Sequence, residues 1–183
     1  MTIATAAAIA TIATIVLDTN VVLDWLLFED PAVAPLRSAL ATGRVVAVSR
    51  ADCTEELRRV LNYPKLKLDR TRQDCLFDRF NALVRSFDGP AIATRLPQCA
   101  DRDDQKFLEL ARDAQASCLL SKDKRVLVLG RPRAAPLPFR IQTPIVWAAA
   151  WGAGRDAMNS NDPIHQQSQQ SNTADGGRTG MLC

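Results

Sequence analysis

The sequence predicts an α/β fold in which helices cover both faces of a mainly parallel β-sheet. Short apolar segments alternate along the chain with longer segments of helical periodicity. The acidic residue Asp18 directly follows the first apolar segment, and parallel sheets gather ligands at the carboxyl ends of their strands. The chain has 183 residues, 47% of them hydrophobic, which suits a single domain with a substantial core.

Five short segments have the apolar character of buried strands. They are residues 15–17, 45–48, 91–94, 117–120 and 139–142. Helical patterns separate these segments, so we expect consecutive strands to run parallel and to be joined through helices. The first long connection contains a helix, because Asp30-Pro31 provides an N-cap and a proline at the first helical position, and Gly43 ends the segment.

Three further helices are predicted from capping residues and periodicity. The first spans residues 50–62 and begins at Ser49 and Asp52, which are spaced like a capping box. The second covers residues 69–87 and ends before a Gly-Pro pair, and the third covers residues 103–115. Strands and helices therefore alternate as in βαβ units.

The chain divides by composition into three parts. We expect residues 1–14 to be an apolar extension, because they lack the basic start of a secretory signal and are too few to cross a membrane. Residues 15–151 form the folded domain. Residues 152–183 are rich in Gly, Asn, Ser and Gln without apolar periodicity, and we expect them to be a disordered tail.

Charge and cysteine usage limit the classes of function. The formal net charge of +3 permits a nucleic-acid partner without the strongly basic footprint of a sequence-reading DNA-binding protein. Five cysteines with no C-x-x-C pair and a single histidine argue against a zinc site or a disulfide framework. We expect reduced thiols in a cytoplasmic protein without a membrane partner.

Acidic residues recur where strands end or helices begin. The apolar stripe of the helix over residues 50–62 consists of Cys53, Leu57, Val60 and Leu61. At 100° per residue, Glu55 lies almost opposite this stripe and Glu56 flanks it. Glu55 is therefore expected in solvent, whereas Glu56 is able to reach the edge of the sheet.

Asp101-Arg102-Asp103-Asp104 places three carboxylates immediately before an apolar helix. One acid there is explained by the helix dipole, but three exceed that need. Asp104 shares the packed side with Leu108, and the helical angle alone leaves Asp103 open as well.

The segment 117–120 repeats the arrangement at Asp18, since Ser121 and Asp123 follow it. Acids that end neighbouring parallel strands lie close together and repel, unless a divalent cation lies between them. Carboxylate oxygens suit Mg²⁺ or Mn²⁺. Lys122 and Lys124 flank Asp123 and are the candidate contacts for substrate phosphates, because the acids themselves would repel a polyanion.

These motifs, taken in order, resemble the PIN-domain family of ribonucleases. The resemblance rests on Asp18-Thr19-Asn20, on Glu56 in Glu-Leu-Arg-Arg-Val-Leu, on Asp104 before Gln-Lys-Phe-Leu-Glu-Leu-Ala, and on Asp123 in Ser-Lys-Asp-Lys-Arg-Val-Leu. It covers about residues 15–147 and is strongest to bacterial proteins described as toxins of toxin–antitoxin pairs. Ser121 stands where many relatives have Thr.

The resemblance implies a three-layer α/β/α sandwich with strand order 3-2-1-4-5 and metal-dependent cleavage of RNA. Asp18, Asp104 and Asp123 would bind Mg²⁺ or Mn²⁺, and Glu56 would position the metal or a water. The family pattern favours Asp104 over Asp101 as the third ligand. Asn20, Asp101 and Ser121 would be supporting residues.

The partners implied are an RNA substrate, a cognate antitoxin and a second copy of the chain. Two other functions are consistent with parts of the pattern. The first is a catalytically inactive PIN-fold module that binds RNA or protein. The second is a phosphatase that uses Asp18 as a nucleophile, although Asn20 stands where that chemistry commonly needs a second acid.

Overall fold

The computed structural model describes the backbone of residues 12–159 and the side chains of residues 12–152. Five parallel strands form one sheet in the order β3-β2-β1-β4-β5, which confirms the predicted fold class and strand order. The strands are β1 (Ala13–Leu17), β2 (Val45–Ser49), β3 (Val84–Ser86), β4 (Cys118–Leu120) and β5 (Arg140–Gln142).

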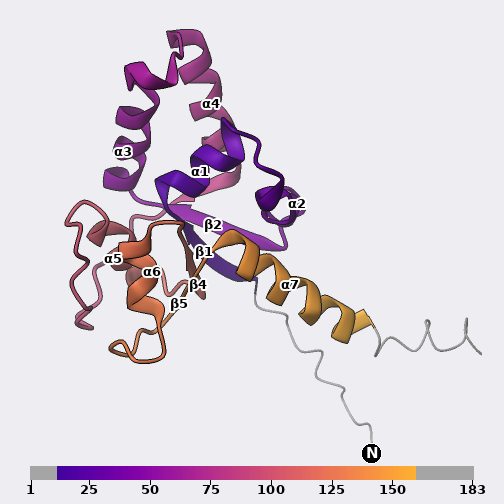
Figure 1. The fold of residues 1–183 in the computed structure, drawn as a ribbon, viewed down its shortest axis with the longest axis vertical. Helices are drawn as coiled ribbons and strands as arrows, with labels where there is room; N and C mark the ends of the chain where they lie inside the picture. Colours follow the sequence, from indigo (N-terminus) through magenta and orange to yellow (C-terminus); the bar gives the residue numbers. More distant parts are fainter. Residues whose placement is uncertain (1–11, 160–183) are drawn as a thin grey trace, which may run out of the picture. The chain divides into compact units, whose positions relative to one another are not determined.

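Helices lie on both sides of this sheet, with α5 and α6 on one side and α2 on the other (Figure 1). The α3 and α4 helices run beside each other and extend beyond the sheet. The helices are α1 (Thr19–Leu26), α2 (Ala34–Ala41), α3 (Ala51–Leu61), α4 (Arg70–Leu83), α5 (Gln105–Asp113), α6 (Lys124–Leu127) and α7 (Pro144–Asn159). Short 3₁₀ turns cover Pro31–Val33, Pro64–Leu66 and Val128–Gly130.

The central strands are buried because both of their faces meet helices. Val16 of β1 and Leu119 of β4 are fully buried and share one hydrophobic cluster with Phe107 and Leu108 of α5. Their apolar, partly β-branched side chains suit a strand that is covered on both faces. This packing fixes α5 against the two strands whose ends carry Asp18 and Asp123.

Aspartate N-caps start several helices at the carboxyl edge of the sheet and elsewhere. Asp18, Asp69 and Asp123 each accept a hydrogen bond from a backbone N–H of the helix that follows. Asp30 caps the turn before α2 in the predicted way, and Gly43 has a positive φ of 67° just after this helix.

Three sequence predictions were wrong. The predicted strand at 91–94 is irregular. The strand is instead Val84–Ser86, which follows α4 with no turn residue between them. The predicted helix over 69–87 therefore ends at Leu83, and Gly89-Pro90 follows the strand and not the helix. Ser49 does not begin a capping box, because it ends β2 and its hydroxyl lies 3.1 Å from that of Thr54.

The ends of the chain lie mainly outside the described residues. Only residues 12–14 of the predicted extension 1–14 are described, and β1 begins at Ala13. The α7 helix continues past the predicted domain end at 151 to Asn159, and residues 160–183 of the predicted tail lie outside the described residues. A compact unit ends at Trp147 within α7.

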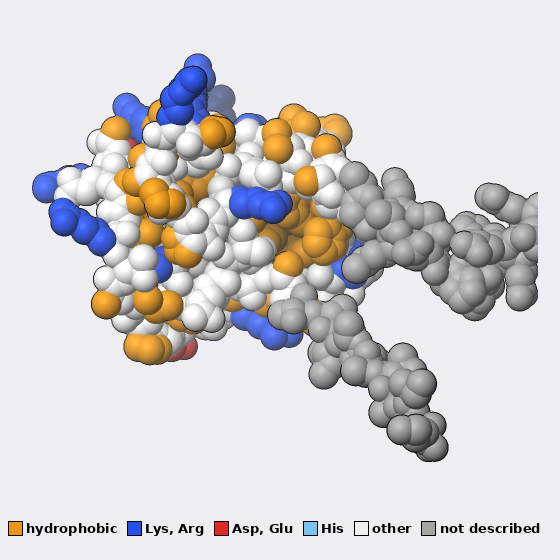
Figure 2. Space-filling view, turned by 90° about the horizontal axis from the view of Figure 1, so that it is seen from below, with side chains coloured by type: hydrophobic (Ala, Val, Ile, Leu, Met, Phe, Trp, Pro, Cys, Tyr) orange, Lys and Arg blue, Asp and Glu red, His pale blue; other side chains and the backbone are white. Residues whose placement is uncertain are grey.

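Basic side chains are abundant on one face of the protein. On the face drawn in Figure 2, Lys and Arg side chains are abundant and acidic ones are nearly absent. Cys53, Cys99 and Cys118 are buried free thiols, and Cys75 is an exposed one. None of the helices in the described part of the chain has the length and apolar character needed to cross a membrane.

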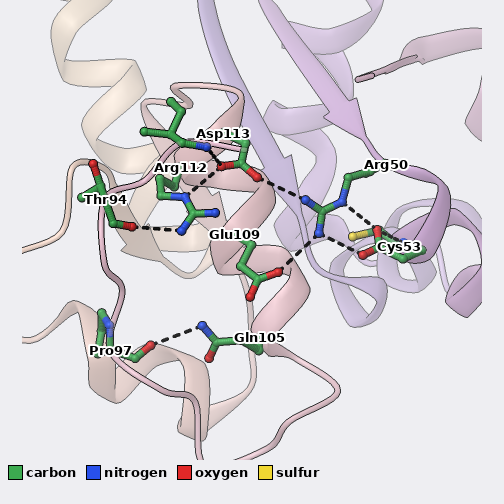
Figure 3. A network of polar contacts seen from close by, with 10 residues as sticks. Arg50, Cys53, Thr94, Pro97, Gln105, Glu109, Arg112 and Asp113 are labelled. Atoms are coloured by element: carbon green, nitrogen blue, oxygen red, sulfur yellow. Dashed lines mark hydrogen bonds and ion pairs between the residues drawn. The ribbon is translucent and has the colours of Figure 1, made fainter. Parts of the chain in front are cut away.

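A buried carboxylate holds the long loop between β3 and α5 in place (Figure 3). The Asp113 side chain is 2% exposed and accepts hydrogen bonds from the Ile92 backbone N–H at 2.9 Å, from Arg112 Nε at 2.8 Å and from Arg50 Nη1 at 3.2 Å. Burial opposes ionisation of Asp113, yet these donors lower its pKa below the ordinary value.

We predict that Asp113→Ala destabilises the fold by about 3 kcal/mol, because it leaves two arginines and a buried N–H without their acceptor. Urea unfolding at neutral pH measures this change. Glu109→Ala is the control, since the Glu109 side chain is 41% exposed and we expect a change within about 0.5 kcal/mol. Equal stability of wild type and Asp113→Ala would contradict this role.

Candidate active site

Backbone pairing brings the ends of β1 and β4 together. The Asp18 N–H donates to the Leu120 carbonyl at 2.9 Å, and the Ser121 N–H donates to the Gln142 carbonyl at 3.1 Å. The sheet ladder thus continues one residue past the strands, and it sets Asp18 beside Ser121. This is the adjacency that the sequence predicts for acids and hydroxyls that follow parallel strands.

Asp18 is the most enclosed acid of this edge. It is 3% exposed, and its carboxylate accepts hydrogen bonds from Asn20 Nδ2 at 2.9 Å and from the Ser121 hydroxyl. Burial raises the pKa of Asp18 despite these donors, and the negative charge of Glu56 adds to the effect. The carboxylate is therefore fixed in direction and short of positive charge.

Asn20 and Ser121 join the two strand ends and do not act as isolated helix caps. The Asn20 Oδ1 atom accepts a hydrogen bond from the Lys122 N–H at 3.2 Å. The Ser121 hydroxyl oxygen accepts one from the Asp123 N–H at 3.0 Å. Both side chains thereby connect Asp18 to the segment that carries Asp123.

Glu56 enters the site from α3 with the orientation that its helical phase predicts. Its side chain is 12% exposed, whereas Glu55 lies in solvent. The Thr19 hydroxyl donates to Glu56 Oε1 at 2.7 Å, and Lys106 forms an ion pair with Oε2. Glu56 is thus connected both to the residue after Asp18 and to α5.

Sequence reasoning missed Thr19 and Lys106. Thr19 lies between Asp18 and Asn20, which the sequence predicts in the site, and this position was a sign that Thr19 also belongs to it. Lys106 lies in the first turn of α5, where the helix dipole disfavours a cation. That unfavourable position was a sign that a nearby acid, here Glu56, compensates the charge.

Asp104 has the clearest electrostatic signature of the site. It lies just before α5, and its carboxylate caps no backbone N–H and accepts no hydrogen bond from the described residues. Burial and the charges of Asp18, Asp123, Asp101 and Glu56 raise the pKa of Asp104 to about 7. The acids chosen from sequence therefore act on one another through space.

Asp101 and Asp123 have additional partners. Asp101 accepts the Asp103 N–H at 3.0 Å and pairs with Arg125 Nη1 at 2.7 Å, so it stabilises a turn and a surface ion pair. Asp123 caps α6 by accepting the Arg125 N–H at 2.7 Å. The Asp101 carboxylate is thus already paired with Arg125, whereas the Asp104 carboxylate has no ion pair among the described residues.

The donor set suits a hard divalent cation. Within residues 12–152, no three His, Cys, Asp or Glu side chains stand close enough to share one ion. The acids are carboxylates, and the burial and charge repulsion that raise the pKa of Asp104 would be relieved by a cation. Mg²⁺ and Mn²⁺ prefer such oxygen ligands, and they retain waters that complete their coordination.

The two lysines predicted to contact phosphates differ in their surroundings. Lys122 Nζ lies 2.7 Å from Asp24 Oδ2 and 3.7 Å from Asp30 Oδ2, so its charge is already compensated. Lys124 is exposed and forms no ion pair within the described part of the chain. Of the two, Lys124 has the ammonium group that is available to a substrate.

Comparison with known proteins adds one finding. The sequence model of a family described as the PIN domain matches residues 14–125. This match spans more than half of the chain and contains Asp18, Glu56, Asp104 and Asp123. A search of curated proteins found no match.

We predict that Asp104→Asn makes the metal-free protein more stable at neutral pH. The pKa of Asp104 is about 7 in the fold against 3.8 ordinarily, so this group lowers stability progressively as pH rises between these values. Melting temperatures in EDTA at about pH 4 and about pH 8 test this. The melting temperature of Asp104→Asn should exceed that of the wild type at the higher pH only. Asp103→Asn, at an exposed position, should have the wild-type melting temperature at both. A loss of stability in Asp104→Asn at the higher pH would contradict the repulsion.

Proposed function

The chain belongs to the PIN domain family, whose members are generally nucleases, and from this premise we propose that it is a metal-dependent endoribonuclease. The reaction is hydrolysis of phosphodiester bonds in RNA. The observation that carries the proposal is the gathering of Asp18, Asp104, Asp123 and Glu56 at one edge of the sheet, where burial and the negative charges of its neighbours raise the pKa of Asp104 to about 7. Such repulsion is characteristic of carboxylates arranged for a cation.

Asp18, Asp104 and Asp123 would hold Mg²⁺ or Mn²⁺, which supplies Lewis-acid polarisation of the scissile phosphate and a water of lowered pKa. The protein contributes orientation. Asn20 and Ser121 hold the Asp18 carboxylate in one direction, and burial keeps this side chain from bulk water. Within the described residues, Asp18, Asp104 and Asp123 do not stand close enough to share one ion, so binding of the cation would draw their carboxylates together.

Glu56 and its two partners act on the attacking water. Thr19 and Lys106 each hold one carboxylate oxygen, so Glu56 has a fixed orientation toward the site. From there it orients the water and accepts its proton as the oxygen attacks phosphorus. The attack breaks the bond from phosphorus to the leaving ribose oxygen, which takes up a proton to become a hydroxyl.

We extend the proposal to the biological role and the location. The motifs at Asp18, Glu56, Asp104 and Asp123, taken together, resemble those of bacterial toxin components, which favours the toxin of a toxin–antitoxin pair. A cognate antitoxin and a second copy of the chain are the corresponding partners. A cytoplasmic location agrees with the buried free thiols of Cys53, Cys99 and Cys118.

Substitution of the acids separates catalysis from folding. Asp18→Asn should lower Mn²⁺-dependent cleavage of labelled RNA by at least about 100-fold, because it removes charge at the metal. Glu56→Gln should also lower activity strongly. Glu55→Gln is the matched control and should change the rate by less than about twofold, since this neighbouring side chain points to solvent.

Two results would contradict the nuclease proposal. The first is undiminished cleavage by well-folded Asp18→Asn, which would assign the activity to another site or to a contaminant. The second is RNA binding by the wild type without cleavage in Mg²⁺ or Mn²⁺. This result would instead support an inactive PIN-fold binding module. Melting curves establish that each variant is folded.

A further inference from the structure

A large groove lies between the β3–α5 loop and α5, next to the acids of the candidate active site. The proposed mechanism gives this groove no role. Its volume is about 1340 Å³. This exceeds the ~300–1,000 Å³ that is usual for small-molecule sites, so an extended ligand fits it better. The groove is lined by residues 93–100, Arg102, Gln105, Lys106, Glu109 and Arg112.

The walls of the groove are fixed by hydrogen bonds across it, which Figure 3 shows between the loop and α5. Gln105 Oε1 accepts the Cys99 N–H at 2.7 Å, and Gln105 Nε2 donates to the Pro97 carbonyl at 3.4 Å. Arg112 Nη1 donates to the Thr94 carbonyl at 2.9 Å. A loop held in this way requires little ordering when a ligand binds.

Positive charge dominates the lining. Arg95, Arg102, Lys106 and Arg112 contribute four cations against the one acid Glu109. Arg112 is occupied by Asp113 and the loop, and Lys106 by Glu56. Arg95 and Arg102 are exposed and have no acidic partner among the described residues. Two cations of the groove are therefore available to a polyanion.

One end of the groove adjoins the candidate active site. Lys106 lines the groove and also contacts Glu56, and Gln105 directly follows Asp104. A chain of phosphates in the groove would thus lead to the acids, whose own charge repels phosphate. No aromatic side chain lines this groove, so the lining favours contacts to the backbone over stacking with bases.

We propose that this groove holds the phosphodiester backbone of single-stranded RNA on one side of the scissile bond, with Arg95 and Arg102 as its phosphate contacts. The inference rests on the proposed nuclease function and names the path of its substrate. A basic groove that follows the backbone without reading bases is the usual solution for single strands. The recognition is therefore tolerant of sequence.

The test measures binding of a fluorescein-labelled oligouridylate to the full chain by anisotropy, in EDTA and over a range of salt concentrations. Each phosphate contact of a single strand contributes about 0.7 to the slope of log affinity against log salt. Arg95→Ala/Arg102→Ala should weaken binding roughly tenfold and reduce that slope by about 1.4. Arg95→Lys/Arg102→Lys should keep the wild-type slope, because the charges remain.

Arg131→Ala/Arg133→Ala is the matched control, since it removes two exposed arginines that do not line the groove. This pair should leave both affinity and salt slope unchanged. In Mn²⁺, the Arg95 and Arg102 double variant should raise KM for the same RNA with little change in kcat. The two contacts bind the strand away from the reacting phosphate, so the chemical step is retained.

Three outcomes distinguish the two proposals. If the wild type cleaves RNA and Arg95→Ala/Arg102→Ala has the same affinity and salt slope as the wild type, RNA binding in the groove is contradicted and the nuclease function is supported. Loss of affinity in this variant without any wild-type cleavage would support the groove and contradict the nuclease. Absence of RNA binding by the folded wild type would overturn the groove.

Discussion

The buried carboxylate of Asp18 is the constraint on which this site depends. It lies at the junction of β1 and α1, 3% exposed, where an isolated charge is costly to desolvate. Ser121 and Asn20 offset part of that cost, and in doing so they connect the ends of β1 and β4. The same hydrogen bonds therefore connect the two strand ends and orient the Asp18 carboxylate.

Electrostatics in the site oppose stability. Burial and the charges of the neighbouring acids raise the pKa of Asp104 to about 7, so ionisation of this group lowers the free energy of unfolding at neutral pH. Lys106 compensates Glu56, yet Asp104 has no such cation among the described residues. A divalent cation would relieve this penalty, which is why the proposed function includes one.

The sequence predicted the part of the fold that local pattern determines. Apolar segments that end in Asp18 or Asp123 defined β1 and β4, and the phase of α3 separated Glu56 from Glu55. The edge strand β3 was missed, because Val84 is buried while Arg85 and Ser86 are exposed, and no turn residue separates the strand from α4.

The missed functional contacts are those between distant segments. Lys106 is explained only by Glu56 of α3, and the order of the β3–α5 loop depends on Asp113 near the end of α5. Both charges are unfavourable to the dipole of their own helix, so their positions have no local reason. Charged residues placed against a helix dipole are therefore a useful sequence signal for such long-range pairs.

In the proposed site, Asp18, Asp104 and Asp123 share one divalent cation. Anomalous diffraction from crystals grown with Mn²⁺ tests this arrangement, because the metal position is observed independently of activity. We expect a peak bound by oxygens of these three residues at about 2.1 Å, with waters completing the coordination. A peak elsewhere, or none at Mn²⁺ concentrations that support cleavage, would contradict it.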